Sequence, residues 1–159
     1  MLDPFGTAAD RFRLPATGPT DDMHPGWPES TPFVRLPASA VFPSGARMRL
    51  RPLLRSDGHE WRRQRIEDES FLRSVEPTQA APWAAAHSQQ AWWNHLMYLR
   101  TAAREALVVP LVIEVEGQFV GQITLGNIQH GSIRDCWIGY WVYSAIHGAG
   151  VATAATPLG

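Results

Sequence analysis

The sequence predicts an α/β (α+β) fold, in which a mixed sheet is flanked by helices. Two patterns support this prediction. Apolar residues recur at helical spacing within residues 57–105, and from Val108 the period changes to that of strands. The resulting order is strand, helix, helix, hairpin, strand and helix start, which supplies helices that can cover a sheet. A chain of 159 residues, 45% of them hydrophobic, is long enough for one domain.

Composition excludes several classes of function. The formal net charge is -1 and no basic cluster stands out, so neither nucleic-acid nor acidic-membrane binding is expected. No apolar run has the length of a membrane span, and the N-terminus does not read as a secretory signal. The single cysteine, Cys136, cannot form an intrachain disulfide, which favours a cytoplasmic location. We expect a buried structural thiol there; a nucleophile would need a base and an opening, and neither is visible.

Residues 1–45 form a Pro-rich N-terminal extension in which an irregular conformation is expected. Eight prolines within residues 1–43 remove backbone donors and interrupt helices and central strands. Apolar anchors appear only after Met23, which could be the true start of translation. Ordered structure is expected from about Ala46, so residues 46–159 form the predicted domain.

The domain is predicted to begin with a strand and a helix. Arginines alternate with apolar residues over 47–53, as in a half-buried strand that Pro52 confines to an edge or an end. Ser56 or Asp57 can cap a helix that runs to about Ser70. The run of acids at 67–69 is either the solvated end of this helix or a substrate-facing acidic patch.

A second helix is expected from Ser88, its cap, to about Glu105, after a loop that Pro77 and Pro82 bracket. One face of it carries apolar residues at spacings of three and four, namely Trp92, Leu96, Leu99 and Ala103. His87 and His95 lack a paired ligand at metal spacing and are read as ordinary side chains. Four tryptophans are either anchors or the lining of an acceptor groove: Trp27, Trp83, Trp92 and Trp93.

The last third of the chain reads as strands. Residues 109–115 and 118–125 flank the turn Glu116-Gly117 and form a predicted hairpin. A third strand covers about 134–143, and because both of its faces are mainly apolar we expect it to be buried on both sides. Residues 147–155 then read as a glycine loop that leads into a helix, where backbone N–H groups can bind a phosphate.

The ordered combination in residues 109–153 resembles the GCN5-related N-acetyltransferase (GNAT) superfamily. It comprises the hairpin, Gly121-Gln122-Ile123-Thr124-Leu125, Trp137-Ile138-Gly139-Tyr140-Trp141-Val142 and His147-x-x-Gly150-x-Ala152-Thr153. It is more closely similar to the RimJ/RimL-like branch, which acetylates the N-terminal α-amine of ribosomal proteins. The start Arg49-Leu50-Arg51-Pro52-Leu53 and the Trp92-Trp93 helix also fit that branch.

The resemblance implies acetyl-CoA as donor substrate, an amine as acceptor and no metal. The diphosphate of acetyl-CoA would bind backbone amides around Gly148–Thr153, and the pantetheine arm of acetyl-CoA would pair with the preceding strand. The cofactor-binding residues so implied are Tyr140, Trp141, Val142, Gly148, Ala149, Gly150, Val151, Ala152 and Thr153. His147 and Ala149 depart from the family's usual residues, which implies weaker binding. The alternative interpretation is that residues 147–150 only connect two elements.

The resemblance does not assign a catalytic residue. The nearest acidic candidates for a base are Glu67, Asp68 and Glu69 on the first helix and Glu114 in the hairpin, where a solvent-facing role is equally open. The acceptor is expected to be an N-terminal α-amine of a protein, while antibiotic amines and free amino acids stay open. The oligomeric state is not indicated.

The family's fold continues beyond the helix at which this sequence ends, so the C-terminal half of the fold is expected to be missing. Pro157 falls where that helix should enter its second turn. Two hypotheses follow. The chain represents an N-acetyltransferase seen incompletely, or it is a truncated, non-catalytic remnant or interaction module. In both, the apolar strand at 134–143 is expected to be exposed and prone to aggregation.

Overall fold

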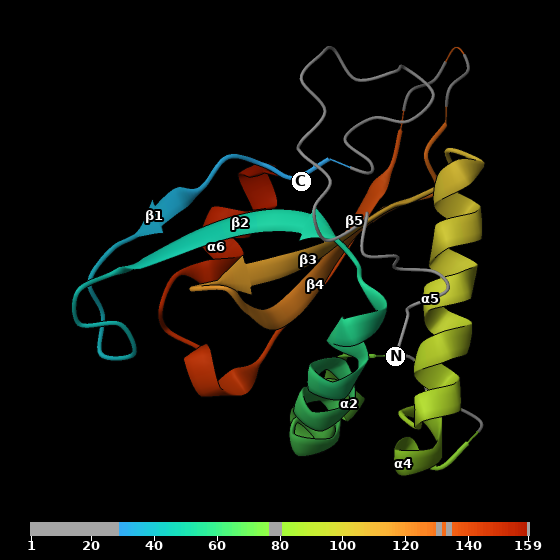
Figure 1. The fold of residues 1–159 in the computed structure, drawn as a ribbon, viewed down its shortest axis with the longest axis horizontal. Coiled ribbons are helices and arrows are strands. Elements are labelled where there is room, and N and C mark those ends of the chain that lie inside the picture. Colours follow the sequence, from blue (N-terminus) through green and yellow to red (C-terminus); the bar gives the residue numbers. More distant parts are fainter. Residues whose placement is uncertain (1–28, 77–80, 130–131, 133–134, 159) are drawn as a thin grey trace.

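The computed structural model describes residues 29–76, 81–129, 132 and 135–158. Within them, five strands form one sheet in the order β1-β2-β3-β4-β5, and each neighbouring pair is antiparallel (Figure 1). The strands are β1 (Val34–Leu36), β2 (Ala46–Pro52), β3 (Val109–Val115), β4 (Gln118–Gly126) and β5 (Trp137–Val142). Helices lie beside the sheet, so the predicted α/β class is confirmed.

The helices between β2 and β3 cover one face of the sheet. They are η1 (Arg55–Asp57), α2 (Gly58–Glu67), α3 (Glu69–Val75), α4 (Trp83–Ala86) and α5 (Gln89–Arg104). The predicted cap of α5 is confirmed, since the Ser88 hydroxyl accepts a hydrogen bond from the Ala91 N–H at 3.1 Å. The expected first helix is instead divided at Asp68 into α2 and α3. Trp83, expected in a loop, begins the short α4.

Two clusters of buried side chains lie on opposite faces of the sheet. On one face, α2 and α5 contribute Trp61, Trp92 and Leu96, which pack with Val112 and Phe119. The residues of the other cluster, which α6 (Val151–Ala155) joins, are Leu36, Ala46, Met48, Leu50, Val109, Leu111, Ile113, Val115, Val120, Ile123, Val142, Ala149, Val151 and Ala155. Because α6 docks across β1 and β2 as well as β5, the glycine loop that precedes it is anchored to the sheet. None of the described helices is long and apolar enough to cross a bilayer.

The described structure begins before the predicted boundary at Ala46. β1 pairs with β2 in the register Val34 to Met48 and Leu36 to Ala46, and Leu36 is fully buried. Residues 29–45 therefore carry an edge strand where only irregular structure was expected, because tertiary pairing overrides the local effect of Pro32 and Pro37. The expectations for residues 1–28, including Met23 and Trp27, lie outside the described residues.

β5 lies at the end of the described sheet, which corrects two expectations. Trp137, Ile138 and Tyr140 expose 53%, 45% and 55% of their surface, so the strand is not buried on both faces. Part of its apolar surface is exposed. Cys136, expected to be a buried thiol within this strand, is exposed and directly precedes it.

Candidate functional site

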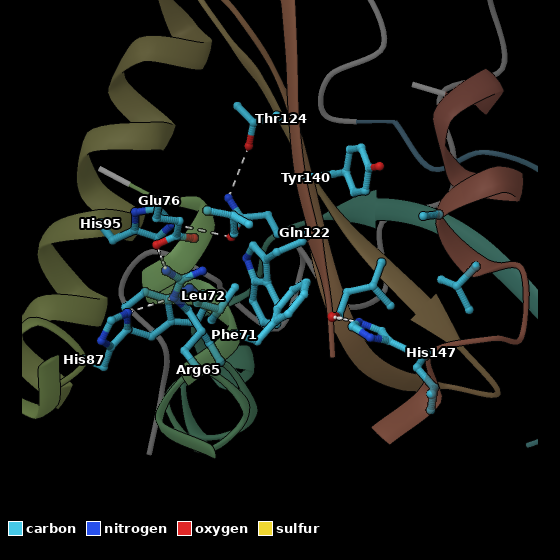
Figure 2. A pocket seen from close by; sticks show the side chains of 18 of the residues that line it. Arg65, Phe71, Leu72, Glu76, His87, His95, Gln122, Thr124, Tyr140 and His147 are labelled. Atoms are coloured by element: carbon cyan, nitrogen blue, oxygen red, sulfur yellow. Dashed lines mark hydrogen bonds and ion pairs between the residues drawn. The ribbon is translucent and has the colours of Figure 1, made fainter. Parts of the chain in front are cut away.

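A cleft of about 1110 Å³ lies around the exposed edge of β5. One wall comes from α2, α3, α5 and the adjoining side of β4, and the other comes from the segment between β5 and α6 (Figure 2). Figure 2 places Arg65, His87 and His95 on the helical side, and Tyr140 and His147 on the other side of the strand. The fold thus brings the predicted donor loop and a helical wall into one cavity.

The glycine loop has the backbone geometry that an anion site needs. Gly148 and Gly150 have φ values of 85° and 77°, which side chains with a Cβ rarely adopt. A Cβ at Gly148 or Gly150 would meet no heavy atom within 4 Å, so the space beside both residues is open. The first turn of α6 follows, and the N–H groups of Val151–Thr153 have no acceptor one turn earlier within the helix. These groups can donate to an oxyanion.

The outer edge of β5 offers backbone groups to the cleft. The Tyr143 N–H donates to the Val120 carbonyl on the β4 side at 2.8 Å. Because successive residues of an antiparallel strand alternate, the backbone groups of Val142 and Tyr140 point away from β4. His147 already uses one of them, with its Nε2 2.9 Å from the Val142 carbonyl oxygen. The imidazole of His147, a residue that departs from the family pattern, therefore occupies one backbone acceptor at the outer edge of β5.

Eight of the nine predicted cofactor-binding residues line this cleft. They are Tyr140, Trp141, Val142, Gly148, Gly150, Val151, Ala152 and Thr153. The ninth, Ala149, is 2% exposed and packs in the core, so its side chain anchors the loop instead.

The predicted acidic run does not face the cleft. Asp68 is 4% exposed and accepts a hydrogen bond from the Ser144 N–H at 2.8 Å, as well as one from the Ser144 hydroxyl. Glu67 accepts from the Tyr143 hydroxyl and from Arg63. Glu67 and Glu69 are largely exposed, with 47% and 45% of their side chains accessible, as expected for a solvated helix end. Asp68 departs from both interpretations, because it fastens the junction of α2 and α3 to the segment after β5.

Glu114, the remaining acidic candidate for a base, belongs to a buried ion-pair network. Its carboxylate lies 2.8 Å from Arg49 Nε and 2.5 Å from Arg51 Nε, and Arg51 also pairs with Asp57 at 2.8 Å. Burial alone would raise the pKa of Glu114, but the hydrogen bonds from Arg51 and Arg49 outweigh it and lower the pKa. A solvent-facing role is excluded by its 6% exposure, and its partners make it a structural anion.

The helical wall holds two histidines whose charged forms are disfavoured. Burial is the largest cause that lowers the pKa of His95, to about 4, and it also lowers the pKa of His87. His95 stacks on Trp61 at a centroid distance of 5.3 Å, with Nε2 3.4 Å from the Gln122 side-chain oxygen. His87 Nδ1 lies 2.7 Å from the Trp83 carbonyl oxygen and donates to it, while Nε2 accepts from Arg65, so the ring is neutral.

Arg65 and Glu76 were missed in the sequence, although both line the cleft. The Arg65 Nε–H donates to His87 Nε2 at 2.8 Å, and its Nη2 lies 2.5 Å from the Glu76 carboxylate (Figure 2). The Arg65 guanidinium also lies 5.2 Å from the Trp141 ring centroid. The only sequence indication for Arg65 is its spacing of four from Trp61, which places both residues on the same face of the helix.

The tryptophans named for an acceptor groove lie elsewhere, as far as the structure describes them. Trp83 and Trp92 are 4% and 3% exposed and anchor helices through their indole N–H groups, which donate to the carbonyls of Arg65 and Arg55. Trp83, Trp92 and Trp93 do not line the cleft, whereas Trp141, predicted for the cofactor, and Trp61, which was not predicted, do. Among the described residues, no group of three or more His, Cys, Asp and Glu side chains could hold a metal ion.

Comparison with solved structures supports the predicted resemblance. RimJ from Mycobacterium smegmatis, in complex with CoA-disulfide, is 40% identical over 82% of this chain and 59% of that protein, with a TM-score of 0.75. Ribosomal-protein-S5-alanine acetyltransferase from Vibrio fischeri is 18% identical over 77% and 62%, with a TM-score of 0.59. An acetyltransferase from Salmonella typhimurium that modifies the N-terminal serine of ribosomal protein L7/L12 is 15% identical over 76% and 62%, with a TM-score of 0.56. No protein-family model and no curated protein matches the chain.

The chain therefore has the fold of these acetyltransferases, in agreement with the predicted resemblance to the GNAT superfamily. The similar solved structures include RimJ, ribosomal-protein-S5-alanine acetyltransferase and RimL. The chain spans about three-fifths of the length of these proteins. The likeness at 40% identity extends over most of this chain, whereas the two more distant structures support the fold alone.

Proposed function

We propose that this chain forms the donor-binding part of an acetyl-CoA-dependent N-acetyltransferase whose acceptor is an amine. The observation that carries the proposal is that the glycine loop, the first turn of α6 and the edge of β5 open into one cleft. Its volume of about 1110 Å³ suits a large, extended ligand. The similar RimJ was solved in complex with CoA-disulfide, which supports the same ligand here.

The residues present fit a coenzyme A derivative. A diphosphate placed at Gly148–Thr153 would accept hydrogen bonds from N–H groups in the first turn of α6, and the open space at both glycines admits it closely. The pantetheine arm would pair with the outward backbone groups of Tyr140 and Val142, after His147 leaves the Val142 carbonyl. Ala149 would contribute through its backbone, since its side chain is buried.

In the reaction, the amine nitrogen bonds to the thioester carbonyl carbon, the C–S bond breaks, and a proton leaves the nitrogen as the thiol departs. We further propose that the acceptor is the N-terminal α-amine of a protein, a ribosomal protein among the candidates. Support comes from the resemblance to the RimJ/RimL-like branch, which includes the RimJ structure that is 40% identical to this chain. No residue of this chain is assigned as the base.

Coenzyme A titrated into the purified chain tests the donor site. We expect saturable binding that shifts the amide resonances of residues 148–153, with about tenfold weaker binding in Gly150→Ala, because alanine disfavours a φ of 77°. Gly117→Ala is the matched control, because Gly117 has a φ of 76° and similar open space in the β3–β4 turn. Its binding should be unchanged. A folded chain that binds no coenzyme A would contradict the proposal and favour the interaction module.

A further inference from the structure

The helical wall of the cleft contains one acidic side chain, Glu76, among the described residues that line it. The cation next to it is Arg65, while His87 and His95 remain neutral near pH 7. The wall is therefore close to electroneutral and lacks the surplus of positive charge that would repel an ammonium group. These charges belong to the helical wall, which lies apart from the donor loop.

Arg65 holds the Glu76 carboxylate in place. The guanidinium is 8% exposed and is fixed by His87 and by rings around it, so it cannot follow a ligand. Glu76 lies at the C-terminal end of α3 and keeps 25% of its side chain exposed. An ionised carboxylate can accept several hydrogen bonds, so Oε2 can serve Arg65 while Oε1 serves a ligand.

The surroundings favour a cation beside this carboxylate. Leu72 and Val75 line the cleft next to Glu76, and the aromatic faces of Trp61 and Trp141 lie on the Arg65 side of it. Apolar walls strengthen the attraction between unlike charges because they reduce screening by water. An ion pair that served stability alone would not need one partner to remain accessible from a cavity of this size.

We propose that Glu76 binds the protonated α-amine of the acceptor, as a specificity-determining residue on the wall opposite the donor loop. The inference deepens the proposed function and rests on it for the identity of the reaction. The ligand class is a primary ammonium, and an acylated amine lacks the charge that Glu76 recognises. The carboxylate orients the acceptor, and the ammonium must lose one proton to water before its nitrogen can attack the thioester. Glu76 is not assigned as the base.

The test uses two probes that differ only in the amine, tetra-alanine and N-acetyl-tetra-alanine. Binding to the full chain is followed by chemical-shift titration of the Arg65 side-chain Nε–H and neighbouring amides. We expect tetra-alanine to bind about tenfold more tightly than the acetylated peptide. The preference should disappear in Glu76→Gln and persist in the matched control Glu69→Gln, which removes the same charge from an exposed ion pair on α3.

Each outcome is decisive for Glu76. Equal binding of the two peptides to the wild-type chain, no binding of either, or an unchanged preference in Glu76→Gln would each overturn the inference. The comparison of the two peptides on the wild-type chain shows whether the preference exists, even where Glu76→Gln fails to fold. In that case Glu76→Asp tests the residue with its charge retained. The inference then requires that the preference for the free amine be weaker than in wild type but still present. The coenzyme A titration fails or succeeds separately, so the two proposals are distinguishable.

Discussion

β3 and β5 are two strands of one sheet that look equally apolar in the sequence, yet they have opposite environments. Every residue of β3 is buried, including Glu114, whereas most of β5 is exposed or half-buried. β3 has strand neighbours on both edges, while β5 has one described neighbour, β4. An apolar sequence therefore shows that a strand can be buried, whereas the neighbouring elements decide whether it is buried. The cleft lies at the strand of lower burial.

The largest expected contrast comes from one truncation made in each strand. Ile113→Ala in β3 should lower the free energy of unfolding by about 4 kcal/mol, because Ile113 is fully buried and its removal leaves a cavity. Ile138→Ala in β5 should cost less than about 0.5 kcal/mol, because Ile138 is 45% exposed. Urea unfolding of both variants measures the difference. Equal costs would show that β5 is as well packed in solution as β3.

The charged residue of β3 gives the next effect. Glu114→Gln should destabilise the chain by about 3 kcal/mol, since it leaves Arg49 and Arg51 without their shared anion in a mostly buried site. Glu69→Gln removes a glutamate from the exposed pair with Arg73 and should cost less than about 0.5 kcal/mol. The same unfolding assay applies. A cost for Glu114→Gln no greater than that for Glu69→Gln would refute the buried network.

Acidification tests the burial of His95, which lies on α5 with its Nε2 3.4 Å from the side-chain oxygen of Gln122 in β4. The folded-state pKa of His95, about 4, lies below its ordinary value of about 6.5, so the folded chain binds this proton less readily than the unfolded chain. The neutral side chain favours folding above pH 6.5, and this contribution declines as the pH falls toward 4. Between pH 7 and pH 5, wild type should lose about 2 kcal/mol more than His95→Gln. Identical losses would place His95 in water.

The smallest expected change in stability belongs to the exposed face of β5. Ile138→Lys should alter the free energy of unfolding by less than about 0.5 kcal/mol and reduce self-association, because a charge on an edge strand opposes pairing with another chain. Leu107→Lys is the control, since Leu107 is 47% exposed outside the strands. Light scattering against protein concentration compares them. A similar effect of both variants would mean that β5 is not the associating surface.

Much of the fold was predictable from local sequence. The hairpin β3–β4, the Ser88 cap of α5 and the glycine loop before α6 agree with the structure because neighbouring residues determine each. β1 was missed because its three residues pair with β2 across the turn at Gly45 despite nearby prolines. The burial of Asp68 was also missed, since its partner Ser144 is 76 residues away.

The candidate site divides in the same way. Residues 148–153 form one continuous motif, so sequence could point to the donor loop, and eight of nine predicted residues line the cleft. Arg65 lies on α2 and Glu76 directly follows α3, 11 residues later, with no motif between them. Their contact depends on the turn between α2 and α3. Sequence therefore located the wall made by one segment and missed the wall that several segments build.

The order of elements, the period of each helix and strand, and the positive-φ glycines before α6 were already determined by the sequence, because they depend on covalent geometry and on residues a few positions apart. The tertiary structure decided which apolar strand is covered, that Asp68 and Glu114 are buried anions, and that Glu76 meets Arg65 inside a cleft. These outcomes depend on which surfaces meet after folding. Burial and charge pairing are properties of the packed molecule, whereas periodicity is a property of the chain.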